Sequence, residues 1–200
     1  MASVVTYDPT TGNYLVNGAV ASAAAVQAAA QAAVQTAQGT ISSLSLQFQQ
    51  GAINYQAWYS GMQIEIANMA AAQTALAHGG FASMDAAAWQ RAVDVANNQL
   101  AYFDNFAAQV VPPAPFGQRE LNRAAMYADA GRATYENERM TTQKGMGATE
   151  AQRVLGASDS CPDCIAWEAL GWIPIEDMES DYPIGASVCL VNCFCSIVVR

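Results

Sequence analysis

The sequence predicts a mainly α protein, in which an antiparallel, alanine-rich helical bundle follows an N-terminal arm or hairpin and precedes a small C-terminal cysteine-rich module. Apolar residues recur three and four positions apart through most of the chain, which is typical of helices that bury one face. Alanine and glutamine dominate residues 20–50, and all five cysteines lie after residue 160. We expect the arm at 1–21, the bundle at 22–147 and the module at 148–200.

The composition argues against two classes of partner. Hydrophobic residues make up 52% of the chain and charged residues only 12%, so we expect that either protein partners or alanine and glutamine cover the surface that charges would otherwise solvate. The 8 Lys and Arg face 17 Asp and Glu, for a formal charge of −9. Neutralising phosphates requires clustered basic residues, so neither nucleic-acid binding nor an anionic membrane surface is expected.

Two features of the first third of the chain bear on location. The start, MASVVTYDPT, lacks a basic region followed by an apolar run, so we expect no signal peptide and a cytosolic protein. No charged side chain occurs from residue 9 to residue 64, but glutamine recurs at Gln27, Gln31 and Gln35, and alanine is barely hydrophobic enough for insertion. A transmembrane span is therefore not expected.

The arm and the first helix have local signals. The stretch DPTTG and the pair Asn17-Gly18 lie between short apolar runs, which indicates a hairpin or an extended arm. Ser22 is a candidate N-cap for a helix that buries one stripe of apolar residues, namely Val26, Ala30 and Val34. Gly39 is expected to end or kink this helix before a short second segment through Phe48.

Three more helices complete the predicted bundle. Asn54 can cap the second, which His78-Gly79-Gly80 closes; its apolar positions are Trp58, Met62, Ile66, Met69, Ala72 and Leu76. Ser83, with Asp85 in the first turn, opens the third, whose seam follows a heptad pattern through Trp89, Val93, Ala96, Leu100, Phe103, Ala107 and Val110. Proline breaks this helix within 111–117.

The fourth helix is expected from about Gln118 to Lys144. Its inward side chains are predicted to be Leu121, Ala125, Ala128 and Tyr135. Its outward side chains are predicted to be Arg119, Arg123, Glu136, Glu138 and Arg139. Small residues on these helices permit close approach in an antiparallel bundle.

The C-terminal module changes in character and carries the candidate site. Helical periodicity stops, turns and short strands are expected, and no base lies between Arg153 and Arg200. Cysteines occur as C-x2-C and then C-x3-C-x-C, at Cys161, Cys164, Cys189, Cys193 and Cys195. Two such clusters can supply the four thiolates of a tetrahedral zinc site. A module of about fifty residues has too small a core to be stable alone, so a metal ion would help to hold it together. We expect a structural zinc held by four of the five.

Two other interpretations of the cysteines stay open. Disulfides could form in an oxidising setting, although they are uncommon in cytosol. A redox-active C-x2-C is disfavoured because no strand–helix–strand context surrounds it, and Pro162 and Asp163 supply no positive charge. The intervening apolar residues are expected to form a small core around the metal, with a final strand at 197–199; they are Trp167, Leu170, Trp172, Ile173, Ile175 and Tyr182.

Catalytic signals are weak, so we expect no enzyme. The single histidine, His78, lies at a helix end without an evident base partner in the sequence. Asp177 and Glu179 fall in an acidic stretch that we expect to be a solvated loop. The stretch GMGATEAQR lacks the lysine and the spacing of a phosphate-binding loop.

Several stretches resemble the minor head proteins of tailed bacteriophages, the group of Mu-type head-morphogenesis proteins. The cysteine-bearing stretches RVLGASDSCPDCIAWEALGWIPI, YPIGASVC and NCFC carry the resemblance, and the opening YDPTTGNYLVNGAVAS is similar to the start of short members. The resemblance implies a structural virion protein that acts in capsid assembly near the portal or the capsid shell. Its implied partners are the portal and the major capsid protein, in an oligomeric setting.

The implied location is the virion head, with host cytoplasm during assembly. The alternative is a capsid cement or decoration protein, or a component of the head-tail connector. Copy number per virion separates a minor head protein, present in few copies, from a cement protein, present in hundreds. A third interpretation, an acidic zinc-ribbon adaptor of the host cell, predicts a soluble monomer without virion association.

Overall fold

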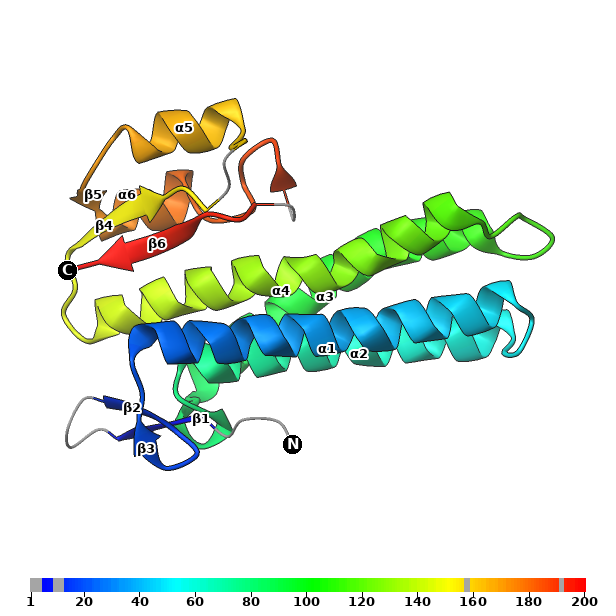
Figure 1. The fold of residues 1–200 in the computed structure, drawn as a ribbon, viewed down its shortest axis with the longest axis horizontal. Helices are drawn as coiled ribbons and strands as arrows, with labels where there is room; N and C mark the ends of the chain where they lie inside the picture. Colours follow the sequence, from blue (N-terminus) through cyan, green and yellow to red (C-terminus); the bar gives the residue numbers. More distant parts are fainter. Residues whose placement is uncertain (1–4, 9–12, 157–158, 191–192) are drawn as a thin grey trace.

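The computed structural model describes residues 5–8, 13–156, 159–190 and 193–200. Four long helices lie side by side, a small sheet lies at the end where the first of them begins, and a mixed module packs against the last (Figure 1). The predicted fold class is confirmed. Among the described helices, none combines the length and the apolar character that crossing a membrane requires.

The bundle consists of α1 (Ala23–Gln49), α2 (Tyr55–Ala77), α3 (Ala86–Ala107) and α4 (Gln118–Gly145). Consecutive helices run antiparallel (Figure 1). Both α1 and α3 pack along α2, whereas α4 packs along α1 and α2 and only slightly against α3. Because α4 also contacts the C-terminal module, it is the element that joins the two parts.

Side-chain caps begin three of these helices. The Ser22, Asn54 and Asp85 side chains each accept a hydrogen bond from the backbone N–H three residues on, at 3.2, 2.9 and 2.7 Å. The first two caps were predicted. The third differs, because Phe81–Ser83 forms a short 3₁₀ turn, and the helix begins after Asp85 instead of after Ser83.

The predicted hairpin forms, with one additional strand. Strands β1 (Val5–Asp8), β2 (Asn13–Val16) and β3 (Ala19–Val20) pair in antiparallel order. Asn17 and Gly18 connect β2 to β3 with φ of 52° and 82°, the left-handed backbone that a tight two-residue hairpin turn requires. Residues 9–12 of the DPTTG stretch lie outside the described part of the chain.

The bundle core is built around one tryptophan. Trp58 is fully buried, and its indole N–H donates to the Ser45 hydroxyl at 3.2 Å. Its ring centroid lies 5.0 Å from that of Phe48, 5.4 Å from that of Phe103 and 5.3 Å from that of Phe116. Such aromatic contacts add directional packing to the free energy of apolar burial.

The expectation that Gly39 ends or kinks the first helix is wrong. Helix α1 continues through this glycine to Gln49, and a Cβ at Gly39 would meet nothing within 4 Å. Glycine costs an exposed helix about 1 kcal/mol relative to alanine, which is not enough to break it. Ala37 and Ile41 on either side are buried, and their packing holds the helix together.

The predicted seam of α3 is correct only in its second half. Phe103, Ala107 and Val110 are buried, and Ala96 is nearly so, but Trp89 and Val93 are 43% and 48% exposed. Ala88 and Ala92 are buried in their place. An α-helix drifts away from a strict seven-residue repeat, and two alanines let α2 approach more closely than large side chains would.

Helix α4 has the predicted length, but two of its acidic residues were assigned to the wrong environment. Glu136 and Glu138 are 2% and 6% exposed, whereas the sequence placed both outward. Leu121 and Ala125, placed inward, are half-buried. The reason is that α4 lies between the other helices and the module, so it is covered on more than one side.

The C-terminal module consists of a small sheet and two short helices. Strand β4 (Glu150–Val154) pairs antiparallel with β5 (Ile173–Pro174) on one side and with β6 (Ser196–Val199) on the other. The final strand was predicted. The helices α5 (Pro162–Glu168) and α6 (Ile175–Asp181) were not, because seven residues are too few to show a helical period.

Candidate metal centre

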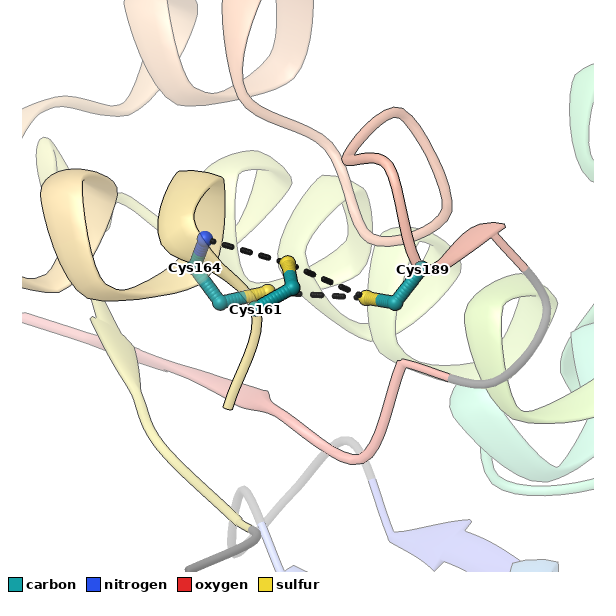
Figure 2. A group of neighbouring side chains, drawn as sticks. All are labelled: Cys161, Cys164 and Cys189. Carbon is teal, nitrogen blue, oxygen red and sulfur yellow. Dashed lines mark hydrogen bonds between the residues drawn. The ribbon is translucent and has the colours of Figure 1, made fainter. Parts of the chain in front are cut away.

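The fold brings the five cysteines of the module together from three places in the chain. Cys161 caps the N-terminus of α5 and Cys164 lies in its first turn. Cys189 lies in the connection between α6 and β6, and Cys193 and Cys195 come directly before β6. All five are free thiols. Figure 2 shows the sulfurs of Cys161, Cys164 and Cys189 pointing toward one another.

The C-x2-C pair is positioned by the start of a helix. Cys161 has extended backbone (φ −68°, ψ 158°), and Pro162 occupies the first helical position, where its missing N–H costs nothing. The Cys164 backbone N–H therefore points back at the Cys161 sulfur, 3.5 Å away. This turn places both thiols on the same side of the chain, facing the second cluster.

Three pairs of sulfur atoms have a spacing close to that of metal ligands. The Cys161 and Cys189 sulfurs are 3.5 Å apart, and the Cys164 sulfur is 3.7 Å from those of Cys189 and Cys193. A tetrahedral zinc with Zn–S bonds of about 2.3 Å separates its sulfurs by about 3.8 Å. Bonded disulfide sulfurs would be about 2.05 Å apart.

The five predicted ligands form two overlapping groups. In the first group, the sulfurs of Cys161, Cys164 and Cys189 lie within 4.8 Å of one another. In the second group, the same holds for the sulfurs of Cys164, Cys193 and Cys195. Cys164 belongs to both groups and is 1% exposed. The cysteine cluster thus has the chemistry and the spacing to hold a metal ion, with Cys164 at its centre.

The surroundings of the thiols shift their pKa values in opposite directions. The Cys164 backbone N–H is the main cause that lowers the pKa of Cys161 to about 7. Burial raises the pKa of Cys164 and, less strongly, that of Cys189. Burial opposes ionisation of Cys193 as well, but the Cys195 backbone N–H, the Cys164 side chain and the Arg153 charge together hold its pKa below the usual value.

Two residues that sequence reasoning missed contact the sulfurs directly. The Nη1 of Arg153 lies 3.6 Å from the Cys193 sulfur and 3.8 Å from the Cys164 sulfur. The Ser187 hydroxyl lies 3.1 Å from the Cys189 sulfur and 3.5 Å from the Cys164 sulfur. Both residues are fully buried. The one available signal was that Arg153 is the last base before a long acidic stretch.

The small core around the cluster differs in part from the predicted one. Ile175 is fully buried, and Trp167 packs edge-on against Tyr182 with ring centroids 5.5 Å apart, but Leu170 is 47% exposed. Helix α4 contributes Met140, which is 1% exposed. Besides three of the cysteines, the remaining fully or nearly fully buried members are Ala151, Met178, Ile184 and Ile197. The cysteine cluster therefore sits in a core that the module shares with the bundle.

Polar contacts also fasten the module to α4. The Asn137 side chain accepts from the Ile184 N–H at 2.9 Å and donates to the Ile184 carbonyl at 3.0 Å. Glu179 accepts from Lys144 at 2.7 Å and from Thr141 at 2.8 Å. The expectation of an acidic loop is wrong for both Asp177 and Glu179, which lie on α6. Asp177 is solvated as expected, whereas Glu179 anchors α6 to α4.

The single histidine lies in a partly buried polar group within the bundle. The His78 Nε2 is 3.3 Å from the Glu138 carboxylate, and Arg91 Nε contacts both oxygens of the same carboxylate at 3.0 Å. Thr142 also lies 3.3 Å from the His78 ring. These contacts join the end of α2 to α3 and α4, which gives the residues a structural role.

Comparisons of the chain with protein-family models, with curated proteins and with solved structures found no match.

Proposed function

We propose that the cysteine cluster holds one structural zinc ion through Cys161, Cys164, Cys189 and Cys193. The observation that carries this proposal is the sulfur spacing of 3.5 to 3.7 Å from Cys161 to Cys189, from Cys189 to Cys164 and from Cys164 to Cys193. Cys161, Cys164 and Cys189 form one close group, and metal binding would draw the Cys193 sulfur toward it from the neighbouring group. We assign Cys193 as the fourth ligand and Cys195 as the spare thiol because the Cys193 sulfur lies 3.7 Å from that of Cys164 and 3.6 Å from the Nη1 of Arg153. Zinc takes tetrahedral thiolate coordination without redox chemistry, as a structural site requires.

The architecture supports a structural site over a redox or catalytic one. Cys164 and Cys193 are 1% and 2% exposed, so neither offers an accessible nucleophile. Four protein thiolates leave no open coordination position for water or substrate. The metal would instead link α5, the α6–β6 connection and the start of β6, which otherwise share a small core.

We also propose that the chain is a structural protein of a tailed-phage head, of the minor head type. The resemblance of the cysteine-bearing stretches supports this proposal, and so does the surface of α1. That helix carries no charge in 27 residues, and its exposed positions include Gln31, Gln35 and Gln47. Uncharged surface suits burial against protein neighbours, here the portal or the major capsid protein.

The phage proposal can be tested by quantitative mass spectrometry. Virions would be purified from cells whose DNA includes the gene for this chain, and the copies of the chain per particle would be counted. A minor head protein should be present in few copies per particle and should remain after salt washing. Hundreds of copies would instead support the cement or decoration alternative. Absence of the chain from particles, together with a soluble monomer in the host lysate, would refute a virion role.

A further inference from the structure

Arg153 is a buried cation whose charge needs a partner. Its side chain is fully buried on β4, and a guanidinium keeps its proton under all conditions relevant to proteins. Its Nη2 donates to the carbonyls of Tyr182 and Pro183, and its Cζ lies 4.7 Å from the centroid of the Trp167 ring. Carbonyls and a ring face stabilise the cation but do not neutralise it, and burying an uncompensated charge is costly.

The counter-charge does not come from a carboxylate. Within the described ranges, the ion pairs involve Arg91, Arg139, Lys144, Arg200 and His78, and no acidic oxygen lies within 4.0 Å of the Arg153 nitrogens. Sulfur atoms occupy that place, at 3.6 and 3.8 Å from Nη1. Neutral thiols or disulfides would leave the cation unpaired, whereas metal-bound thiolates supply negative charge.

We infer that Arg153 and Ser187 form the outer shell of the metal centre, with Arg153 as the cation that offsets the excess charge of the thiolates. The inference rests on the proposed zinc site. Four thiolates and one Zn²⁺ carry a net charge of about −2, and one adjacent guanidinium reduces it to about −1 in a buried setting. A thiolate can only accept a hydrogen bond, so with metal bound the Ser187 hydroxyl would donate to Cys189 or Cys164, whose sulfurs lie 3.1 and 3.5 Å away.

Ser187 and Arg153 each contact two sulfurs of the cluster and share one of them. Ser187 lies against Cys189 and Cys164, and Arg153 lies against Cys164 and Cys193. Cys164, the buried sulfur at the centre, is therefore contacted by both. Partners of this kind orient ligands and tune the metal, and their loss typically weakens metal binding about 10- to 100-fold.

The test measures zinc affinity of the full chain by competition with a chromophoric chelator. The variants are Arg153→Met, which removes the charge at similar length, and Ser187→Ala, which removes one oxygen atom. Arg139→Met is the matched control, because Arg139 also anchors the module through a backbone carbonyl, that of Ile197, but its hydrogen bonds go to no sulfur. Circular dichroism of each zinc-loaded variant reports whether the fold is kept.

The absorption spectrum of the cobalt(II)-bound protein gives a second measurement, which would not change if Arg153 only supported the fold. Removing positive charge beside the sulfurs makes the thiolates easier to oxidise, so the sulfur-to-cobalt charge-transfer band of Arg153→Met should shift to lower energy. We expect Arg153→Met and Ser187→Ala to bind zinc about 10- to 100-fold more weakly. The Arg139→Met control should keep the wild-type band and stay within about 3-fold of wild-type affinity, since its site keeps both partners.

The outcomes separate the inference from the zinc proposal. Wild-type zinc binding with unchanged affinity and band in Arg153→Met would overturn the inference and leave the zinc site standing. If Arg153→Met does not fold, the zinc affinity of Ser187→Ala tests the inference instead. Wild-type zinc affinity in Ser187→Ala would then overturn the inference that these residues form an outer shell. A wild-type chain that binds neither zinc nor cobalt would overturn both.

Discussion

Replacing Glu136 with alanine should loosen the C-terminal module from the bundle, because this carboxylate joins the two. Its side chain is 3% exposed. One oxygen accepts from the Ile197 N–H at 3.2 Å and from Arg139 at 3.0 Å, and the other lies 3.5 Å from the Gln27 amide. The variant leaves the strand amide without its acceptor and the arginine without its counter-charge.

The expected loss follows from the burial of the pair. Removing one partner of a buried ion pair costs about 3–5 kcal/mol, and a single hydrogen bond to a charged group is worth about 1.5–3 kcal/mol. Arg139 is 20% exposed and keeps its contact with the Ile197 carbonyl, so the lower end applies. We expect the free energy of unfolding to fall by about 3 kcal/mol, a large share of a typical total of about 5–15 kcal/mol.

Urea unfolding of the zinc-loaded protein, followed by circular dichroism and tryptophan fluorescence, measures this change. Trp58 and Trp89 report on the bundle, and Trp167 and Trp172 report on the module. Glu176→Ala is the matched surface control, because that glutamate also pairs with a cation but is 64% exposed, and its transition should stay in place. If Glu136→Ala unfolds at the same urea concentration as Glu176→Ala, the claim that this carboxylate fastens β6 to α4 is refuted.

Three further predictions concern the site, the helices and pH. Cys164→Ser should abolish stoichiometric zinc binding, whereas Cys195→Ser should keep it, as metal analysis of the purified variants would show. Gly39→Ala should stabilise the chain by about 1 kcal/mol in urea unfolding, whereas Gly131→Ala should show no such gain, because the new Cβ would lie 2.8 Å from a methionine sulfur of α2 and overpacking, which costs about 1–3 kcal/mol, offsets the helix preference for alanine. Burial raises the pKa of Glu65, so its ionised form opposes folding; Glu65→Gln should raise the melting temperature at neutral pH, and this gain should vanish as the pH falls below the ordinary glutamate value. A gain that grows toward low pH would contradict this sign.

Local signals were enough to predict most of the helical bundle. Caps at Ser22 and Asn54 and the apolar period of the helices depend on nearby residues alone, so the sequence contains what is needed. The prediction of buried side chains failed where a neighbouring helix determines which residues are covered. Ala88 and Ala92 are buried in place of Trp89 because α2 approaches the small side chains, and a pattern of hydrophobicity favours the large ones.

The sequence predicted which thiols lie close together, but not what surrounds them; their role as metal ligands stays a prediction. Cysteine spacing alone identified all five thiols, since C-x2-C geometry is local and cysteine is rare in this chain. The pairing of β4 with β6 brings Arg153 toward the cysteines that precede β6, which the sequence did not show. Ser187 lies only two residues from Cys189, but nothing in the sequence marks it as a sulfur contact. The burial of Glu136 likewise depends on a strand sixty residues away.

The most direct test of the account is the metal content of the wild-type chain. The protein would be purified without chelators, analysed by inductively coupled plasma mass spectrometry, and its free thiols counted before and after denaturation in chelator. The account predicts about one zinc per chain, with thiols that become titratable when the metal is removed. A metal-free chain with its cysteines joined in disulfides would contradict it.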